Sequence, residues 1–469
     1  MIAARSGRTD ITNILLEGKH VNLDIQEENG DTAVIIAVQR RKPVTLRELV
    51  RAGSDLNLQN QEGLTPLMIA ARSGRTDITN VLLEGKHIDL DIQEKRTGWS
   101  ALHFSVERGD SATTEALLKA GANPHLKDKD GDTAVIMAVK SHEPDTLREL
   151  VRAGSDLNLQ NNEGLTPLMI AARSERTDIT NILLEGEHIN LDIQEECTGL
   201  SALHFSADRG DSATTEALLK AGANLHLNDK DGDSALTLAA WCGHTNFVVK
   251  LVKAGADLDL QNKNGDTAVI MAVKRHEPAT LRELVRAGSD LNLQNQEGLT
   301  PLMIAARSGR TDITNILLEG EHINLDIQEK RTGQSALHFS AEEGDSATTE
   351  ALLKAGANPH LKDKNGATAM EITEQRAQSS LVSKTLPMRV MMTQPSLYDS
   401  QYALRYQRQL KSERDDLGGD DTSSSLTRLK LKELELVSEG KVPTAGQQSQ
   451  IKMKMTPEMD PEHSPDFNL

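Results

Sequence analysis

The segment of this chain that most suggests chemistry is a run of closely spaced acids, Asp128-Lys129-Asp130-Gly131-Asp132. Carboxylates around a glycine are typical of calcium loops, in which the first and twelfth loop positions must also supply oxygen. When the glycine is aligned with that of an EF-hand loop, those two positions are Leu126 and Met137, whose side chains have no oxygen. We therefore interpret the segment as an acidic turn and predict no metal site.

Histidines and cysteines give no stronger indication of catalysis. His103, His204 and His338 recur with a repeated sequence, which favours a structural role beside a helix-capping hydroxyl. Cys197 and Cys242 are too few for a disulfide framework or a zinc cluster, and no base is identifiable beside either. The sequence has no phosphate-binding loop, serine-nucleophile elbow or His-Glu-x-x-His motif. We therefore predict no catalytic residue and no cofactor, and expect a protein that is not an enzyme.

Composition and charge narrow the classes of partner. The chain has 469 residues, of which 37% are hydrophobic and 2% aromatic, so a large conventional globular core is not expected. Its net charge of −18 argues against wholesale wrapping of nucleic acid or of an anionic membrane. No run of about 18 apolar residues and no signal-peptide core is present, so membrane insertion is not expected. The scarcity of cysteine favours a reducing, cytoplasmic setting.

Internal repetition is the dominant feature of the sequence. Residues 132–164 and 266–298 differ at three of 33 positions and define a first class of unit. A second class begins LTPLMIAARS at 64–98, 165–199 and 299–333, and a third contains SALHFS at 99–131, 200–232 and 334–366. The classes recur in the same order and are interrupted once, by an additional unit at 233–265. Residues 31–366 therefore hold ten complete units.

Each unit carries the local signals of two short helices and a turn. In the second class, Thr65 can cap a helix that starts at Pro66, and Gly74 can end it in a left-handed conformation. A second helix is predicted from Ile78 to Leu83. Two such helices cannot bury their apolar faces alone, so neighbouring units must stack into a continuous core. The predicted fold class is an all-α repeat solenoid.

The unit resembles the ankyrin repeat, which follows the pattern T-P-L-H-x-A-A-x-x-G and closes with L-L-x-x-G-A-x-x-N. In this chain the segments are TPLMIAARSG, SALHFSVERG and SALTLAAWCG, closed by LLKAGAN or LVRAGSDLN. The resemblance covers residues 1–388 and implies helix-turn-helix units with β-hairpin-like turns. The chain departs from the pattern where a loop such as His142-Glu143-Pro144 replaces the cap glycine, and where Glu175 stands in place of a glycine. We expect these departures to loosen single units locally.

The two ends differ from the complete units. Residues 1–30 are interpreted as a truncated repeat, because Met1 aligns with Met68 inside a first helix. Residues 367–388 are interpreted as a degenerate, polar C-terminal capping repeat. Residues 389–469, rich in Ser, Gln, Asp and Pro, are predicted to be a mostly disordered tail.

The tail contains two candidate interaction segments. Tyr398, Tyr402 and Tyr406 would share one face of a helix, which suggests either a docking helix or a helix packed on the end of the array. Two aspartate pairs, Asp415-Asp416 and Asp420-Asp421, could occupy a basic groove of the same chain as an autoinhibitory segment.

The resemblance also implies where partners bind, because turn tips and first helices of ankyrin arrays line a concave groove. The two groove-facing positions before the cap glycine hold ten basic and four acidic residues along the chain. Both tryptophans fall on this surface, and exposed Trp and Arg are frequent binding hot spots. The alternative is a solvated helix face, since Arg and Lys are good helix formers. The predicted groove residues are Arg72, Trp99, Arg108, Lys140, Arg173, Arg209, Trp241, Lys274, Arg275 and Arg307.

Ankyrin repeats are also substrates of 2-oxoglutarate-dependent asparaginyl hydroxylation at an asparagine eight residues after a leucine. The resemblance makes Asn57, Asn158 and Asn292 candidate sites, because each meets that spacing. The alternative, which we prefer, is that these asparagines hydrogen-bond the turn backbone.

Together these features predict a non-enzymatic scaffold or adaptor that binds acidic protein partners through the groove, with Trp241 as an apolar anchor. A second interpretation is the regulatory or targeting arm of a larger enzyme, such as a kinase, a phosphatase complex or a ubiquitin ligase. A third is a mechanical or membrane-skeleton adaptor.

Overall fold

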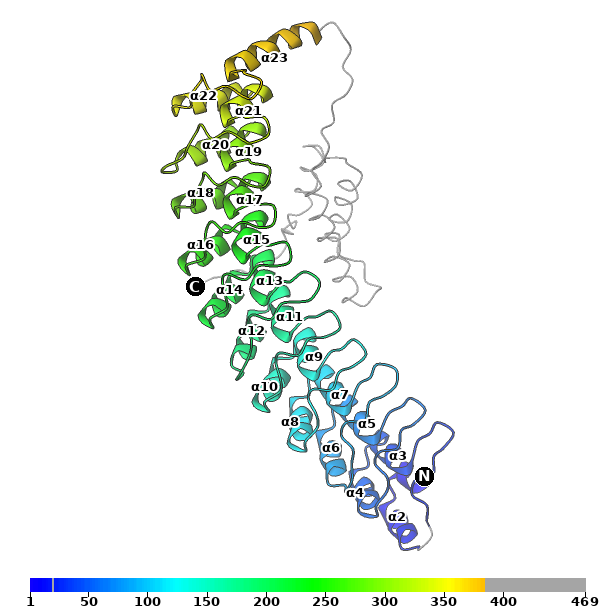
Figure 1. The fold of residues 1–469 in the computed structure, drawn as a ribbon. Coiled ribbons are helices and arrows are strands. Elements are labelled where there is room, and N and C mark those ends of the chain that lie inside the picture. Colours follow the sequence, from blue (N-terminus) through cyan, green and yellow to red (C-terminus); the bar gives the residue numbers. More distant parts are fainter. Residues whose placement is uncertain (19–20, 384–469) are drawn as a thin grey trace, which may run out of the picture. The chain divides into compact units, whose positions relative to one another are not determined.

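The computed structural model describes residues 1–18 and 21–383, and in this part of the chain it shows a stack of helix pairs (Figure 1). In each pair a first helix is followed by a second, and a hairpin-like turn leads on to the next pair. The predicted all-α solenoid is confirmed. Among the described residues, strand-like pairing is confined to two isolated bridges, Asn228 with Ser234 and Lys362 with Thr368.

The helices alternate along the chain between the two positions of the pair. The first helices are α1 (Ile2–Ser6), α3 (Ala33–Gln39), α5 (Pro66–Arg72), α7 (Ala101–Glu107), α9 (Ala134–Lys140), α11 (Pro167–Arg173), α13 (Ala202–Arg209), α15 (Ala235–Cys242), α17 (Ala268–Arg275), α19 (Pro301–Arg307) and α21 (Ala336–Glu343). The second helices are α2 (Thr9–Leu16), α4 (Pro43–Arg51), α6 (Thr76–Leu83), α8 (Ser111–Lys119), α10 (Pro144–Arg152), α12 (Thr177–Leu184), α14 (Ser212–Lys220), α16 (Thr245–Lys253), α18 (Pro278–Arg286), α20 (Thr311–Leu318) and α22 (Ser346–Lys354). A longer helix, α23 (Ala369–Ser383), follows the last pair.

The capping signals act as the sequence predicts. Thr65 Oγ1 accepts a hydrogen bond from the Met68 N–H at 3.2 Å, and Pro66 occupies the first position of α5. Gly74 has φ +62°, the left-handed conformation that glycine adopts at low cost. Helix α6 begins at Thr76, two residues before the predicted start.

The recurring histidines have the predicted structural role. His103 is buried in α7, where its Nδ1 accepts a hydrogen bond from the Ser100 N–H at 3.2 Å and lies 2.9 Å from the Ser100 hydroxyl. Burial lowers the pKa of His103, which favours the neutral imidazole that this arrangement needs. The same contacts recur at His204 with Ser201 and at His338 with Ser335.

The units without a cap glycine differ from the expectation of a separate loop. His142 adopts the left-handed conformation itself, with φ +57°, at the position that glycine occupies in other units. Its imidazole lies 3.4 Å from Asp178 of the next unit, and His276 with Asp312 repeats the contact at 3.0 Å. Glu175 also has φ +58°. A left-handed side chain costs about 1 kcal/mol, so these units keep the turn geometry at the expense of some stability.

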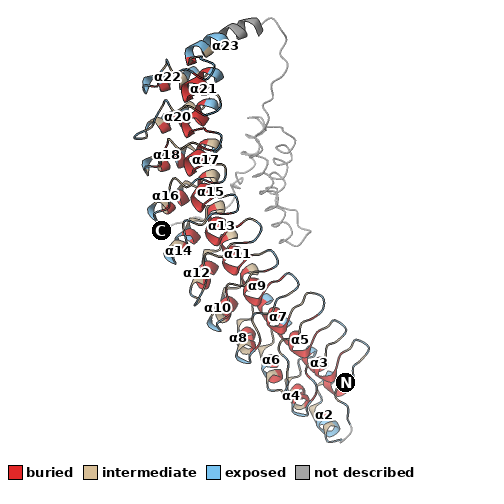
Figure 2. Ribbon diagram, in the orientation of Figure 1, coloured by how far each residue is buried: buried red, intermediate tan, exposed pale blue. Residues whose placement is uncertain are grey.

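Buried residues recur in every helix pair and run through the stack as a core (Figure 2). In α9, every residue from Ala134 to Val139 is buried. Neighbouring first helices pack together, as α15 does with α17, and neighbouring second helices do the same, as α16 does with α18. Each unit therefore buries its apolar side chains against the units beside it.

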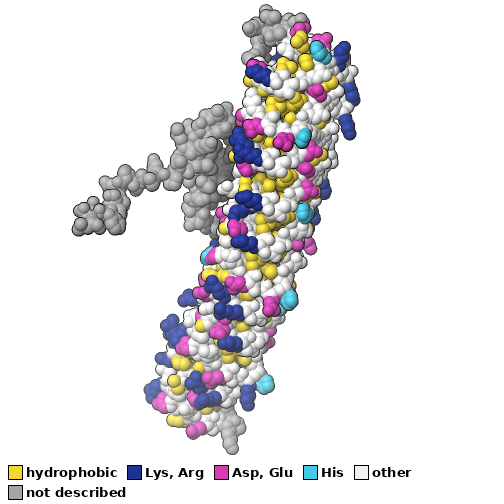
Figure 3. All heavy atoms as spheres, turned by 90° about the vertical axis from the view of Figure 1, so that its left-hand side faces the viewer, with side chains coloured by type: hydrophobic (Ala, Val, Ile, Leu, Met, Phe, Trp, Pro, Cys, Tyr) yellow, Lys and Arg dark blue, Asp and Glu magenta, His cyan; other side chains and the backbone are white. Residues whose placement is uncertain are grey.

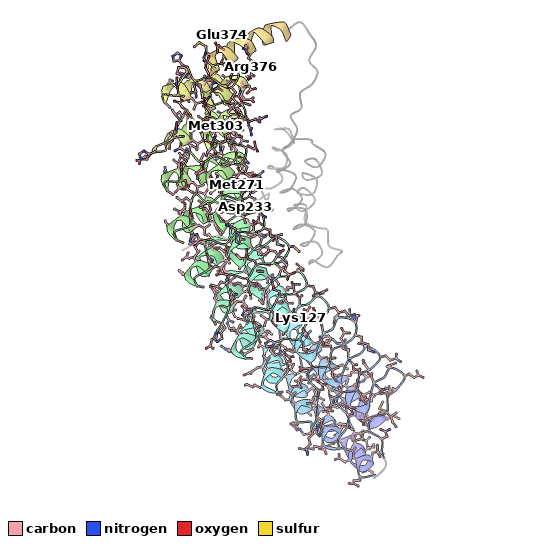
Figure 4. The ribbon with its side chains drawn as sticks, in the orientation of Figure 1. Lys127, Asp233, Met271, Met303, Glu374 and Arg376 are labelled. Carbon is pink, nitrogen blue, oxygen red and sulfur yellow. The ribbon has the colours of Figure 1, made fainter. Side chains whose placement is uncertain are left out.

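Side-chain hydrogen bonds also link successive turns. Gln59 Nε2 donates to the carbonyl of Gly63 in its own turn at 2.6 Å and to that of Gln93 in the next turn at 3.2 Å. The same type of bridge recurs along the array, and Lys127 Nζ donates to the carbonyl of Gln160 at 2.7 Å (Figure 4). These bridges fix the spacing of the turns.

The predicted capping repeat is described as far as residue 383. Helix α23 begins where the Thr368 N–H donates to Glu371 Oε2 at 2.7 Å. Arg376 donates to the backbone carbonyl of Glu342, which ties α23 to the last pair (Figure 4). The tyrosines and aspartate pairs of the predicted tail lie outside the described residues.

Candidate functional site

The first helices and the hairpin turns together form a surface that we call the inner face. On it, a groove of about 1050 Å³ lies between the turn at 59–64 and the turn at 94–99. Its apolar part is formed by Leu64, Trp99 and Phe104, and the ring centroids of Trp99 and Phe104 are 5.3 Å apart at an interplanar angle of 76°. The Trp99 Nε1–H donates to Asp128 Oδ2 at 3.1 Å, so the indole is held in place from the next turn. A groove of this size can accept several side chains of a partner.

Four cationic side chains line the same groove: Arg72, Lys95, Arg96 and Arg108. Arg72 Nη1 pairs with Glu62 Oε2 at 3.3 Å. In the part of the chain that the structure describes, the side chains of Lys95, Arg96 and Arg108 form no ion pair. The groove therefore combines an apolar wall with three cationic groups that are not neutralised by direct contact.

The other acids that line the groove are engaged by the protein itself. Glu94 accepts hydrogen bonds from the N–H groups of Arg96 and Thr97 at 2.6 and 2.5 Å. Burial alone would raise the pKa of Glu94, but hydrogen bonds from Thr97 and Arg96 lower it below its usual value, so the carboxylate stays ionised. Glu107 accepts a hydrogen bond from Ser141 Oγ at 3.1 Å. These carboxylates hold turns and neighbouring units in position.

Two further predicted arginines occupy the position of Arg72 in later units. Arg173 pairs with Glu163 at 3.5 Å and Arg307 pairs with Glu297 at 3.7 Å. The Arg173 side chain is only 10% exposed, whereas that of Arg307 is 43% exposed.

The two predicted lysines serve buried carboxylates. Lys140 Nζ lies 2.7 Å from Asp132 Oδ2, and Lys274 makes the same contact with Asp266 at 2.7 Å. Burial raises the pKa of Asp132, and the hydrogen bonds from Lys140 and Asn161 act in the opposite direction. These lysines pair with aspartates at the start of their own units. The excess of basic residues counted on the groove-facing helix positions is therefore partly neutralised by acidic residues of the turns.

The second tryptophan lies outside the groove lined by Trp99. Trp241 is half-buried in α15, and the guanidinium carbon of Arg275 lies 4.7 Å from the centroid of its rings. This cation–π contact covers one face of the indole. A partner that packs on this face of Trp241 would have to displace Arg275; the anchor role of Trp241 stays a prediction. Arg209, on α13, is also half-buried.

The candidate hydroxylation sites use their amides to join consecutive units. Asn57 Nδ2 donates to the carbonyl of His87 at 2.9 Å, and its Oδ1 accepts from the Asp89 N–H at 2.8 Å. Asn158 and Asn292 make the equivalent contacts. These bonds fit the alternative interpretation of the three asparagines, and their hydroxylation stays a prediction.

Sequence reasoning missed Lys95, Arg96 and Phe104 as groove residues. Lys95 and Arg96 lie on a turn, whereas the predicted columns were confined to helix positions. A usable signal was present, because Lys95, Arg96 and Trp99 are positions at which nearly identical units differ from one another.

The opposite side of the array is formed by the second helices, and Figure 3 shows Lys and Arg side chains repeated along one edge of it. Many charged side chains on this side form ion pairs with a neighbour in the same helix. These pairs are Arg51–Glu48, Lys119–Glu115, Arg148–Asp145, Arg152–Glu149, Lys220–Glu216, Arg286–Glu283 and Lys354–Glu350. No helix of the described residues is both long and apolar enough to cross a membrane.

The stacked pairs and turns define a helical repeat solenoid, a class of protein that presents extended binding surfaces. A family model described as "Ankyrin repeats (3 copies)" matches residues 1–94, 36–128, 102–194, 188–262, 236–328 and 269–363. The chain therefore belongs to the ankyrin-repeat family. Repeats of this family are generally non-enzymatic modules for interaction with other proteins.

Curated relatives share short stretches of repeats with this chain. "Inhibitor of Bruton tyrosine kinase" of Xenopus laevis is 35% identical over 85 residues, 18% of this chain and 6% of that protein. "Ankyrin repeat and SAM domain-containing protein 6" of Mus musculus is 40% identical over 79 residues, 17% and 9% of the two chains. "B-cell lymphoma 3 protein homolog" of Mus musculus is 31% identical over 113 residues, 23% and 25% of the two chains. The matched region thus spans a quarter or less of each relative.

Proposed function

We propose that this chain is a cytoplasmic scaffold that binds acidic protein partners through its inner face. The observation that carries the proposal is the groove at Trp99, which places an apolar wall beside Lys95, Arg96 and Arg108. Exposed Trp and Arg side chains in a pocket are favoured as binding hot spots. On the opposite side, by contrast, many charged side chains pair with a neighbour in the same helix.

Repetition supports a scaffold role. The second and third classes of unit recur three times, so the inner face presents three related versions of one surface. Linked sites on one chain raise the effective concentration of a partner that has more than one matching segment. The array can therefore hold one extended partner that contacts several units.

A capture experiment with charge-reversed variants tests the proposal. The bait with Arg72→Glu and Arg307→Glu changes two inner-face arginines whose side chains are 49% and 43% exposed. The matched control carries Arg152→Glu and Arg286→Glu on second helices, where the side chains are 70% and 66% exposed. We expect partners to be lost from the inner-face variant and kept by the control. Equal losses from both variants would refute an inner-face site.

A second candidate function is the regulatory arm of an enzyme complex. The observation that favours it is that one relative is, by its name, an inhibitor of a tyrosine kinase. The two candidates separate when the captured partners are assayed. A regulatory arm changes the activity of a captured enzyme when purified chain is added, whereas a passive scaffold leaves that activity unchanged.

A further inference from the structure

The repeated triplets give the chain three corresponding versions of the Trp99 groove, and their compositions differ. In the last version, the residues that correspond to the groove lining are the same except at two positions, where Gln334 replaces Trp99 and Glu343 replaces Arg108. The middle version has Leu200 in place of Trp99. It also has Glu196 and Cys197 in place of Lys95 and Arg96.

These exchanges change the charge of the surface. The first version has four cations and three acids among its lining residues. The corresponding positions of the last version hold three cations and four acids, and those of the middle version hold two cations and four acids. The first version alone therefore has a positive formal charge, and it alone has a tryptophan.

We propose that the Trp99 groove is the array's single site for a peptide segment of a partner protein in which Asp or Glu flanks an aromatic or large aliphatic residue. This assignment rests on the proposed function and specifies which groove binds the partner and which kind of peptide segment it binds. The apolar side chain packs on the indole of Trp99. The flanking carboxylates meet Lys95, Arg96 and Arg108, and the guanidinium groups can bind a carboxylate through two parallel hydrogen bonds.

The site is already arranged for such a segment. Phe104 packs against the Trp99 ring in a T-shaped arrangement, and Asp128 accepts a hydrogen bond from its Nε1–H, so the indole loses little freedom on binding. The corresponding supports, Phe339 and Asp363, are present in the last version, where the tryptophan is missing. Two substitutions there should therefore build a second site on an existing frame.

The test uses the full chain and a displayed library of random peptides of about twelve residues, long enough to cross neighbouring turns when extended. Peptides selected on the wild-type chain should share an acidic residue beside an aromatic or large aliphatic one. The variant Trp99→Gln with Arg108→Glu gives the first groove the composition of the last and should weaken their binding about 30-fold. Its helix content, measured by circular dichroism, should match that of the wild type.

The reverse exchange, Gln334→Trp with Glu343→Arg, should raise the calorimetric stoichiometry of a selected peptide from about one to about two. In a Trp241→Phe background, Trp99 is the single remaining tryptophan, so its fluorescence should respond to the peptide. Failure to enrich any peptide, equal binding to the Trp99→Gln/Arg108→Glu variant, or a stoichiometry that stays near one would overturn the assignment.

Two outcomes separate this assignment from the proposed function. Peptides that lose binding with Arg307→Glu but keep it with Trp99→Gln/Arg108→Glu would leave the inner face as the binding surface and remove the Trp99 groove as the site. Enrichment of peptides on a chain that lacks residues 389–469, with no enrichment on the full chain, would identify the chain's own tail as the occupant, which overturns the assignment to an outside partner.

Discussion

Each unit of the first class begins with a buried aspartate, and the variant Lys140→Met tests how much its lysine partner contributes to the stability of the unit. Asp132 is buried, with Asn161 Nδ2 at 2.9 Å and Lys140 Nζ at 2.7 Å from its two oxygens. Loss of one partner of a buried ion pair costs 3–5 kcal/mol, and partial solvation of Lys140, which is 29% exposed, reduces this to about 2 kcal/mol. Hydrogen exchange of the α9 amides should therefore become about 30-fold faster near neutral pH.

The effect should depend on pH in a defined direction. Burial raises the pKa of Asp132 above its usual value in the folded protein, so the folded state takes up a proton more readily than the unfolded state. Without Lys140 the folded pKa rises further. The loss of stability is therefore complete near neutral pH and shrinks as pH falls through the folded pKa, because the variant protonates the buried carboxylate.

Exchange mass spectrometry of peptides from residues 132–164, at neutral and mildly acidic pH, checks both points. Lys140→Gln is the matched control, because Gln39 Nε2 already serves Asp31 at the same position of the first complete unit, at 3.0 Å. This variant should lose much less stability than the methionine variant. The reasoning is refuted if both variants are equally destabilised, or if the methionine variant loses as much stability in acid as near neutral pH.

Two further predictions concern stability. Glu175→Gly should stabilise its unit by about 1 kcal/mol, because Glu175 has φ +58°, and Gly309→Glu should destabilise the corresponding unit to a similar extent. Thermal unfolding followed by circular dichroism should show shifts of opposite sign, and shifts of the same sign would contradict the strain argument. Fusing a second copy of residues 266–302 before Met1 should protect residues 1–18 from hydrogen exchange. In α2, Ile14 and Leu15 are 68% and 50% exposed. The same side chains in the identical sequence of α20, Ile316 and Leu317, pack against the preceding unit and are only 3% and 0% exposed. Burial of these side chains should add about 3 kcal/mol, and the same fusion carrying Asp at the position of Leu281 should lose most of the gain.

Much of the fold could be predicted from the sequence because its determinants are local and repeated. Thr65 and Pro66 start α5 as predicted, since capping depends on residues within one turn of the helix. His103 was assigned correctly because its partner, Ser100, lies three residues away. The left-handed conformation of His142 was missed, because the segment that replaces the cap glycine was interpreted as a loop, although histidine is among the non-glycine residues that adopt this conformation most often.

The site was less predictable because its contacts cross between turns. The helical positions indicated Arg72 and Arg108 but gave no sign of Lys95 and Arg96, which a different turn brings to the same groove. Lys140 was counted as a free cation, although its partner Asp132 stands eight residues earlier, beyond the helix. Charge counted along one helix position therefore overstates the charge that a partner meets.

The most direct test of the central claim is amine-reactive cross-linking of the chain to partners captured from the source cell, followed by mass spectrometry. The turns of the inner face carry Lys95, Lys129 and Lys330, and second helices on the opposite side carry exposed lysines at Lys119, Lys220 and Lys354. Our account predicts that cross-links to partners concentrate on the turn lysines, with Lys95 prominent among them. Cross-links concentrated on the second-helix lysines would contradict it.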